Sequence, residues 1–167
     1  MKKILFVLMM VAAAVAAKAE IGEWALGGQF VYACKSEMPG VGIHFKSNYS
    51  HAWRSTLSAN YYFKKHGVTR YDLNVEQNYL FEVGEKVRLY PLVGATFAYW
   101  HMDDIDIDVA GTHFGVDGDD QARFGANVGA GIDYLIGDHL VLNGEVKYQF
   151  MKDARQVLLG VGVAYRF

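Results

Sequence analysis

The sequence contains very little cysteine or proline. Cys34 is its only cysteine, so no disulfide can form within the chain. Pro39 and Pro91 are its only prolines, whereas glycine occurs 18 times and tyrosine 11 times. Tyrosine is enriched in strands, and proline is depleted from them. This composition therefore favours strands over helices.

Long hydrophobic runs are also absent, except at the N-terminus. There, Lys2 and Lys3 precede an apolar run over residues 4–17, which ends in Ala17-Lys18-Ala19. Positive charge, a short apolar segment and a small-residue cleavage site are typical of a secretory signal peptide. We expect residues 1–19 to be a cleaved signal peptide and residues 20–167 to form one domain. No later run approaches the roughly 20 apolar residues of a membrane-spanning helix.

The chain also lacks an excess of positive charge. Its formal net charge is −2, and removal of Lys2, Lys3 and Lys18 with the signal peptide takes it to −5. Nucleic-acid-binding domains carry basic patches. We therefore do not expect nucleic acid as a partner.

What the chain does have is alternation of side chains with period two. In residues 157–167 the odd positions are Val, Leu, Val, Val, Tyr and Phe, and the even positions are Leu, Gly, Gly, Ala and Arg. Successive side chains of a strand point to opposite faces, so this pattern predicts a strand with one apolar face. Eight such segments follow one another: residues 22–34, 41–49, 52–63, 68–81, 87–100, 122–135, 140–150 and 157–167.

The length and number of these segments predict a membrane barrel. A tilted transmembrane strand needs about 9–11 residues, whereas most strands of soluble proteins have about 5–6. Lipid offers no partners for backbone groups, so a spanning sheet must close on itself. We therefore predict an all-β fold, an eight-stranded antiparallel up-and-down transmembrane β-barrel that follows the signal peptide.

The connections and aromatic residues predict the orientation. An N-terminus in the periplasm places turns 50–51, 82–86 and 136–138 there, and connections 36–40, 64–67, 101–121 and 151–155 outside. Aromatic residues gather near both ends of the predicted strands, in the two interfacial girdles expected of such barrels. The predicted periplasmic girdle comprises Trp24, Tyr49, Trp53, Tyr79, Phe81, Tyr134, Tyr165 and Phe167.

Several short motifs are typical of small barrels: NYYFKK (60–65), VGEK (83–86), LYPLVG (89–94), GANVGAGID (125–133) and YRF (165–167). By these motifs the chain resembles the OmpA/OmpX-like family of eight-stranded outer-membrane barrels, and within it the small barrels common in Bacteroidota. The resemblance implies the cell outer membrane of a Gram-negative bacterium as the location, with outer-membrane lipid and lipopolysaccharide as surroundings. It also implies that Val163, Tyr165 and Phe167 form the signal read by the barrel-assembly machinery. We expect neither a peptidoglycan-binding domain nor cell-wall tethering.

The face opposite the aromatic one carries charges of both signs. An eight-stranded barrel is only wide enough for its side chains to fill, and buried charges must pair. We interpret the charges as an ion-paired plug; the alternative is a narrow porin or a channel for ions or small solutes. The predicted lumen charges are Glu23, Arg54, Arg70, Asp72, Glu76, Arg88, Arg123, Asp133, Glu145, Lys147 and Arg166.

The connection 101–121 is strongly acidic and contains no Lys or Arg. Its alternating stretches predict a hairpin that continues the fifth and sixth strands beyond the membrane and turns at 110–112. Three interpretations remain open: a solvated charged extension, a strand edge that pairs with a partner protein, and a divalent-cation site at Asp104, Asp106 and Asp108. The calcium-loop spacing is not met. The acidic residues are Asp103, Asp104, Asp106, Asp108, Asp117, Asp119 and Asp120.

No catalytic arrangement is evident in the sequence. The nearest approach to a lipid-hydrolase motif, His44-Phe45-Lys46-Ser47, has the wrong spacing, and parity turns His44 inward. We expect no enzyme activity, no catalytic residues, no cofactor and no established metal site. We expect instead a structural or surface-interaction protein, for envelope integrity, adhesion-like contacts or as an accessory subunit of a larger membrane complex, acting through connection 101–121.

Overall fold

The computed structural model describes residues 22–65, 67–102, 105–109, 112–116, 121–152 and 154–167. The predicted signal peptide lies outside these residues. The described residues form one sheet of eight long antiparallel strands and the two-residue strand β5 (Phe81–Glu82). The long strands are β1 (Trp24–Ala33), β2 (Met38–Asn48), β3 (Trp53–Lys65), β4 (Val68–Tyr79), β6 (Val87–Met102), β9 (Gln121–Ile136), β10 (Leu140–Met151) and β11 (Gln156–Arg166).

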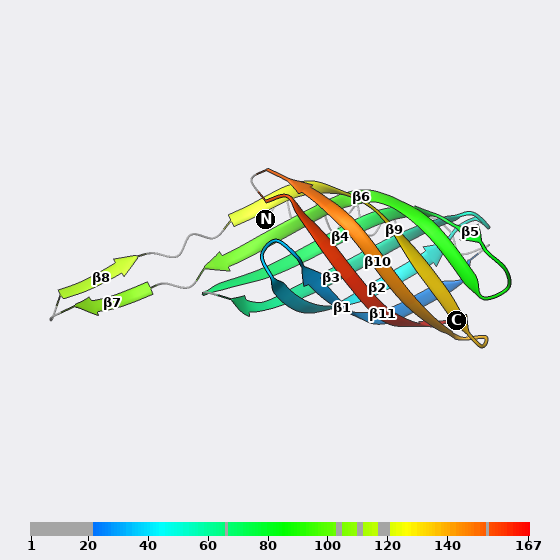
Figure 1. The fold of residues 1–167 in the computed structure, drawn as a ribbon, viewed down its shortest axis with the longest axis horizontal. Helices are drawn as coiled ribbons and strands as arrows, with labels where there is room; N and C mark the ends of the chain where they lie inside the picture. The colour runs from blue at the N-terminus through cyan, green and yellow to red at the C-terminus, as the bar shows by residue number, and fades with distance from the viewer. Residues whose placement is uncertain (1–21, 66, 103–104, 110–111, 117–120, 153) are drawn as a thin grey trace.

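The sheet closes into a barrel (Figure 1). Each long strand pairs with the next long strand along the chain, and β1 pairs with β11. Backbone hydrogen bonds between Trp24 and Phe167 continue this seam to the chain end. The predicted closed eight-stranded antiparallel barrel is therefore confirmed. No helix suited to crossing a membrane occurs in the described part of the chain.

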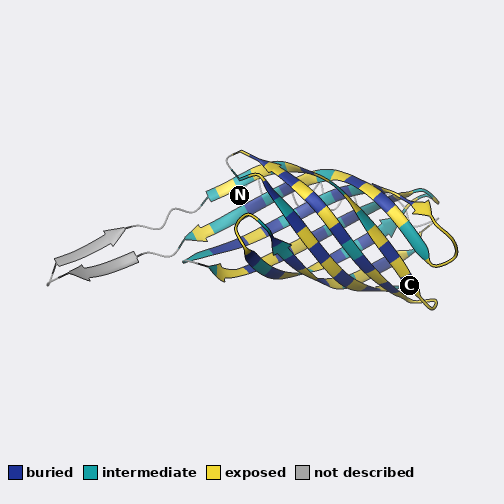
Figure 2. Ribbon diagram, viewed as in Figure 1, coloured by how far each residue is buried: buried dark blue, intermediate teal, exposed yellow. Residues whose placement is uncertain are grey.

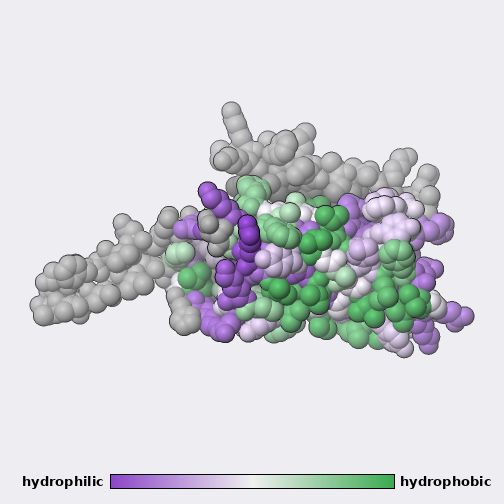
Figure 3. All heavy atoms as spheres, turned by 45° about the horizontal axis from the view of Figure 1, so that its top comes forward, coloured by the Kyte–Doolittle hydropathy of each residue, from purple (hydrophilic) through white to green (hydrophobic). Residues whose placement is uncertain are grey.

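The predicted alternation is visible around the whole barrel. Exposed and buried residues form a checkerboard in Figure 2, and β10 alternates between the two over nearly its full length. Hydrophobic residues lie along the body of the barrel in Figure 3, and hydrophilic residues gather toward its two ends. An apolar outer band of this kind suits lipid, and the other face points into a polar interior.

Aromatic side chains surround both ends of the barrel. All eight residues of the predicted periplasmic girdle are exposed. The ring centroids of Trp53 and Tyr79 lie 5.0 Å apart, and those of Tyr79 and Phe81 lie 4.8 Å apart. We call this end, where Glu23 and Phe167 lie, the terminal end, and the opposite end the hairpin end.

The predicted turn at 36–40 is wrong. Pro39 and Gly40 belong to β2, where Pro39 pairs with Tyr32, and the turn lies at residues 34–37. Glu37 there has a φ of 51°, in the left-handed region that tightens the connection. Proline without a backbone donor is tolerated close to the start of a strand.

The connection 101–121 contains the hairpin of β7 (Ile105–Val109) and β8 (Thr112–Val116). Trp100 pairs with Gln121, and Ile105, five residues later, pairs with Val116, five residues earlier. The hairpin thus continues the register of β6 and β9, as predicted, although it is a separate two-stranded sheet. Thr112 pairs with Val109 and so belongs to β8 rather than to the predicted turn at 110–112, whose other two residues lie outside the described ones.

Glycines on the inner face of β9 allow neighbouring groups to approach. A Cβ on Gly129 would lie 2.7 Å from Lys147 Cα, its partner across the ladder, and one on Gly131 would overlap the ring of Tyr90. Gly144 faces outward on the next strand, and a Cβ there would meet only Ile132 Cγ2, at 3.6 Å. The inner face therefore depends on glycine where the outer face does not.

Gly129→Ala should destabilise the barrel by about 1–3 kcal/mol, the usual range for overpacking. Gly144→Ala, the matched control, should change the free energy of unfolding by less than about 1 kcal/mol. Urea-induced unfolding in lipid vesicles, followed by the gel shift between folded and heat-denatured barrel, measures both. Equal effects of the two substitutions would contradict the inward packing of β9.

Candidate functional site: the charged barrel interior

The barrel interior holds eight buried aspartate, glutamate, lysine and arginine side chains of balanced charge. Among the described residues, four are carboxylates and four are cations, each at most 6% exposed. Charges withdrawn from water must be paired, and this balance makes complete pairing possible. The eight are Lys46, Arg54, Arg70, Asp72, Glu76, Asp133, Glu145 and Lys147.

Nearest the terminal end, Asp133 on β9 binds two cations. Lys46 Nζ lies 3.1 Å from Asp133 Oδ1, and an Arg54 Nη atom donates to the other carboxylate oxygen. In the order of the sheet, β2 and β9 lie on opposite sides of the barrel, so the Lys46–Asp133 pair crosses the lumen. The Arg54 guanidinium also lies 4.3 Å from the centroid of the Tyr90 ring.

At mid-height, Lys147 on β10 joins two carboxylates. Its Nζ lies 2.9 Å from Glu76 Oε1 and 3.2 Å from Glu145 Oε2. Asn127 donates to Glu76 over 2.9 Å, and the Tyr90 hydroxyl donates to Glu145 over 2.8 Å. This cluster links β4, β6, β9 and β10 across the barrel.

Toward the hairpin end, Arg70 on β4 is the central group. One of its Nη atoms lies 3.0 Å from Asp72 Oδ2 and also donates to Gln149 on β10. Its guanidinium lies 4.7 Å from the ring centroid of Tyr62 and 5.2 Å from that of Trp100. Arg70 is thereby held in one orientation by charge, hydrogen bonds and two aromatic faces.

At the terminal mouth, Glu23 receives both half-buried arginines of that end. Its carboxylate lies 2.8 Å from Arg88 Nη1 and 2.8 Å from Arg166 Nη1, and accepts a hydrogen bond from Asn48. Burial opposes ionisation of Glu23, but the hydrogen bond and charge of Arg88 and the charge of Arg166 together hold its pKa below the usual value. The carboxylate is therefore ionised at neutral pH.

Not every predicted lumen charge joins the network. Arg123 lies at the rim of the hairpin end, where it donates to the Lys152 carbonyl and to Gln121. Parity places it on the inner face, close to the start of β9, where its guanidinium lies 5.4 Å from the centroid of the Trp100 ring and forms no ion pair with a described residue. The other predicted charges take part in the ion pairs described above.

Sequence reasoning missed several members of the network. Lys46 has the same parity as His44 and was readable as an inward charge. Tyr90 lies inward by the same rule, and so do the amides Asn74, Asn127 and Gln149. Parity was the available signal for all of them, although it could not show which groups meet across the lumen.

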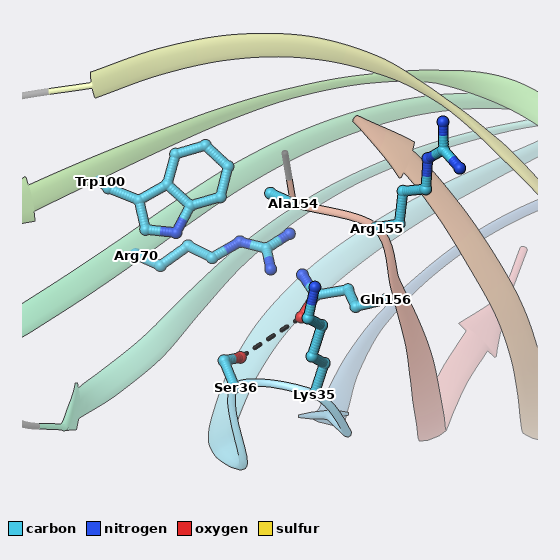
Figure 4. Close-up of a pocket in the computed structure, with 7 residues that line it drawn as sticks. All are labelled: Lys35, Ser36, Arg70, Trp100, Ala154, Arg155 and Gln156. Carbon is cyan, nitrogen blue, oxygen red and sulfur yellow. Dashed lines mark hydrogen bonds between the residues drawn. The ribbon is translucent and has the colours of Figure 1, made fainter. Parts of the chain in front are cut away.

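Small spaces remain at both ends. A cavity of about 240 Å³ at the hairpin end is lined by Lys35, Ser36, Arg70 and Trp100 among others (Figure 4). One of about 260 Å³ at the terminal end is lined by Glu23, His51, Glu82 and Arg88 among others. Between them lie the buried cross-lumen pairs.

The remaining predicted residues lie on the outside of the barrel or beyond it. Val163 and Tyr165 are exposed on β11, and Phe167 is exposed just after it. Asp106 and Asp108 belong to β7, of which the structure describes only the backbone, and Asp103, Asp104, Asp117, Asp119 and Asp120 lie outside the described residues. In the part of the chain that is described, no three His, Cys, Asp or Glu residues are grouped as metal ligands.

Comparison with solved structures finds the same barrel in several outer membrane proteins. The N-terminal β-barrel domain of Pseudomonas aeruginosa OprF is 18% identical, with a TM-score of 0.68, over 88% of this chain and 100% of that one. Ail, the attachment invasion locus protein of Yersinia pestis, is 17% identical, with a TM-score of 0.60, over 89% and 100%. Neisserial surface protein A is 16% identical, with a TM-score of 0.64, over 87% and 97%.

Comparison of the sequence with protein families identifies the family. No curated protein gives a significant sequence match. The family described as the outer membrane protein beta-barrel domain, however, matches residues 4–167. With the apolar outer band and the closed eight-stranded sheet, this match places the protein in the outer membrane. The chain belongs to the outer membrane protein β-barrel family.

Proposed function

We propose that this protein is a closed, non-enzymatic barrel that serves a structural and surface-interaction role in the outer membrane. The observation that carries the proposal is the set of buried ion pairs across the lumen. Lys46–Asp133 crosses between opposite strands, and Glu76–Lys147 crosses at mid-height. A water-filled pore would leave its lining side chains exposed, whereas these four are at most 4% exposed.

The alternative is a narrow channel for ions or small solutes. The cavities at the two mouths favour this alternative. For the two cavities to form a continuous channel, the ion pairs that lie between them would have to break. Breaking a buried pair costs about 3–5 kcal/mol when one partner is lost, so spontaneous opening of several at once is rare. We therefore favour the closed barrel over the channel.

The surface role is assigned to connection 101–121. An orientation with both chain ends in the periplasm puts the hairpin outside the cell. An unpaired β-hairpin edge offers backbone donors and acceptors to a partner strand, and the many aspartates of the connection favour a partner with basic groups. The partner is a neighbouring membrane protein or an extracellular protein. Outer-membrane lipid and lipopolysaccharide surround the apolar band, and Val163, Tyr165 and Phe167 are proposed to guide assembly by the barrel-assembly machinery.

The closed-barrel proposal predicts that the purified protein forms no steady channel in planar lipid bilayers. Its ion pairs fill the lumen, so the membrane current should stay at baseline across the applied voltages. Arg70→Ala and Glu76→Ala provide the decisive comparison. Steady wild-type openings that either substitution abolishes would establish conduction through the lumen and refute the plug.

Lys147→Met should lower the free energy of unfolding by about 3 kcal/mol or more, because it leaves Glu76 and Glu145 without their shared cation. Adding Glu76→Gln should recover part of the loss. Lys65→Met is the matched control, since its pair with Glu37 is largely exposed and such pairs contribute at most about 1 kcal/mol. Urea unfolding in lipid vesicles gives all three values. Similar losses for Lys147→Met and Lys65→Met would argue against a stabilising interior network.

A photo-crosslinking amino acid at position 107, in β7, should form crosslinks to another protein in intact cells, because the hairpin edge is proposed to contact a partner. The same group at position 85, where Glu85 is exposed in a turn at the terminal end, serves as the control. Crosslinks are detected as shifted bands after denaturation. Without shifted bands from position 107, the hairpin is a solvated extension.

A further inference from the structure

Among the described residues, the lining of the cavity at the hairpin end has three cationic side chains and no carboxylate. Lys35 and Ser36 come from the turn between β1 and β2, Arg70 from β4, Arg155 from the connection into β11, and Gln156 from the start of β11. Figure 4 shows the side chains of Arg70, from β4, and Lys35, from the turn, approaching Gln156, whereas the Arg155 side chain points away from them. Segments distant in sequence thus bring three positive charges to one small space.

Among the described residues, only one of these three charges is in an ion pair. The charge of Arg70 is matched by Asp72, 3.0 Å away. Lys35 and Arg155 are exposed and have no ion pair with any described residue, although Lys65 on the same rim pairs with Glu37 at 2.6 Å. The lining therefore has an excess of positive charge, and it favours an anion.

The cavity also offers hydrogen-bonding groups that are already in place. Asp72, Gln149 and the rings of Tyr62 and Trp100 hold the Arg70 side chain, which is 1% exposed. Its buried Nε has no hydrogen-bond partner among the described residues. The Ser36 hydroxyl and the Gln156 amide lie 3.3 Å apart. Because these groups are preorganised, binding at this place would cost little additional ordering.

We propose that this cavity binds a phosphate or sulfate group. Such a group carries several acceptor oxygens, which suit an arginine, a lysine, a hydroxyl and an amide arranged around it. The volume of about 240 Å³ accepts one such group with some water. The group comes either from a lipid headgroup of the surrounding leaflet or from a soluble molecule. The proposal does not depend on whether the lumen conducts.

Trp100 lines the cavity and reports on its contents. In a chain with Trp24→Phe and Trp53→Phe, it is the only tryptophan left. This chain, in phosphatidylcholine nanodiscs, is titrated with inorganic pyrophosphate. In a second arm the nanodiscs contain lipid A with its phosphates or dephosphorylated lipid A. A saturable change of Trp100 emission is expected in at least one arm, weakening as the salt concentration rises.

Two double variants separate a built site from general surface charge. Lys35→Gln with Arg155→Gln should weaken binding about tenfold or more, since both lost groups are charged donors. Lys64→Gln with Lys152→Gln removes the same charge from exposed positions of the same end that do not line the cavity, and it should change affinity by less than about twofold. The gel shift on heating shows that each variant is folded.

Each outcome decides the proposal. A response to pyrophosphate identifies a soluble anion as a ligand, and a response confined to phosphorylated lipid A identifies a headgroup. Absence of a saturable response in both arms, or equal weakening by the two double variants, overturns the site. A response seen only after the seven aspartates of connection 101–121 are replaced by asparagine also overturns it, because the chain itself would then supply the anion.

Discussion

Charge compensation inside a narrow, closed wall is the constraint on which the structure depends. A sheet that faces lipid must turn its polar side chains inward, and eight strands enclose too little space to hydrate them. Four buried carboxylates and four buried cations meet this constraint, because each charge has an opposite charge within reach. Neutral groups such as Asn127 and Tyr90 donate further hydrogen bonds to the carboxylate oxygens of the buried glutamates. The network both permits closure and fills the lumen.

Space for these long side chains is provided by the backbone itself. Gly129 lies directly opposite Lys147, and Gly131 lies against the ring of Tyr90. The side chains of Lys147 and Tyr90 therefore occupy space that a larger residue at either glycine position would fill. Glycine has a cost in strand stability, which is accepted where another group must approach closely. The glycines of β9 and the ion pairs of the interior are thus parts of one packed arrangement.

The outer face and the fold were predictable from the sequence because strand alternation is local. Period two assigns each side chain to a face without knowledge of its neighbours. The pairing of Lys46 with Asp133 was not predictable, since these residues are 87 positions apart and meet only through the stagger of the closed sheet. The start of β2 was predicted wrongly because strand pairing, too, is not visible in the local sequence. Pro39-Gly40 is typical of a turn, yet the ladder between β1 and β2 includes both residues. Arg123 has inward parity but lies at the rim, because parity says nothing of height.

Because the charges of the interior are paired, specific binding of a ligand is expected at the ends of the barrel. Paired buried charges have little net field to offer a ligand, whereas Lys35 and Arg155 at the hairpin end have no ion pair with a described residue. At the terminal end, by contrast, Glu23 pairs with both Arg88 and Arg166, and Glu82 lies 3.5 Å from Arg88, so two carboxylates balance the two arginines. The two mouths therefore differ in kind: one is internally satisfied, and the other retains charge for a partner. The acidic connection 101–121 also starts at the hairpin end, where β6 finishes, so the cations without an ion pair and the aspartate-rich segment belong to the same end of the barrel.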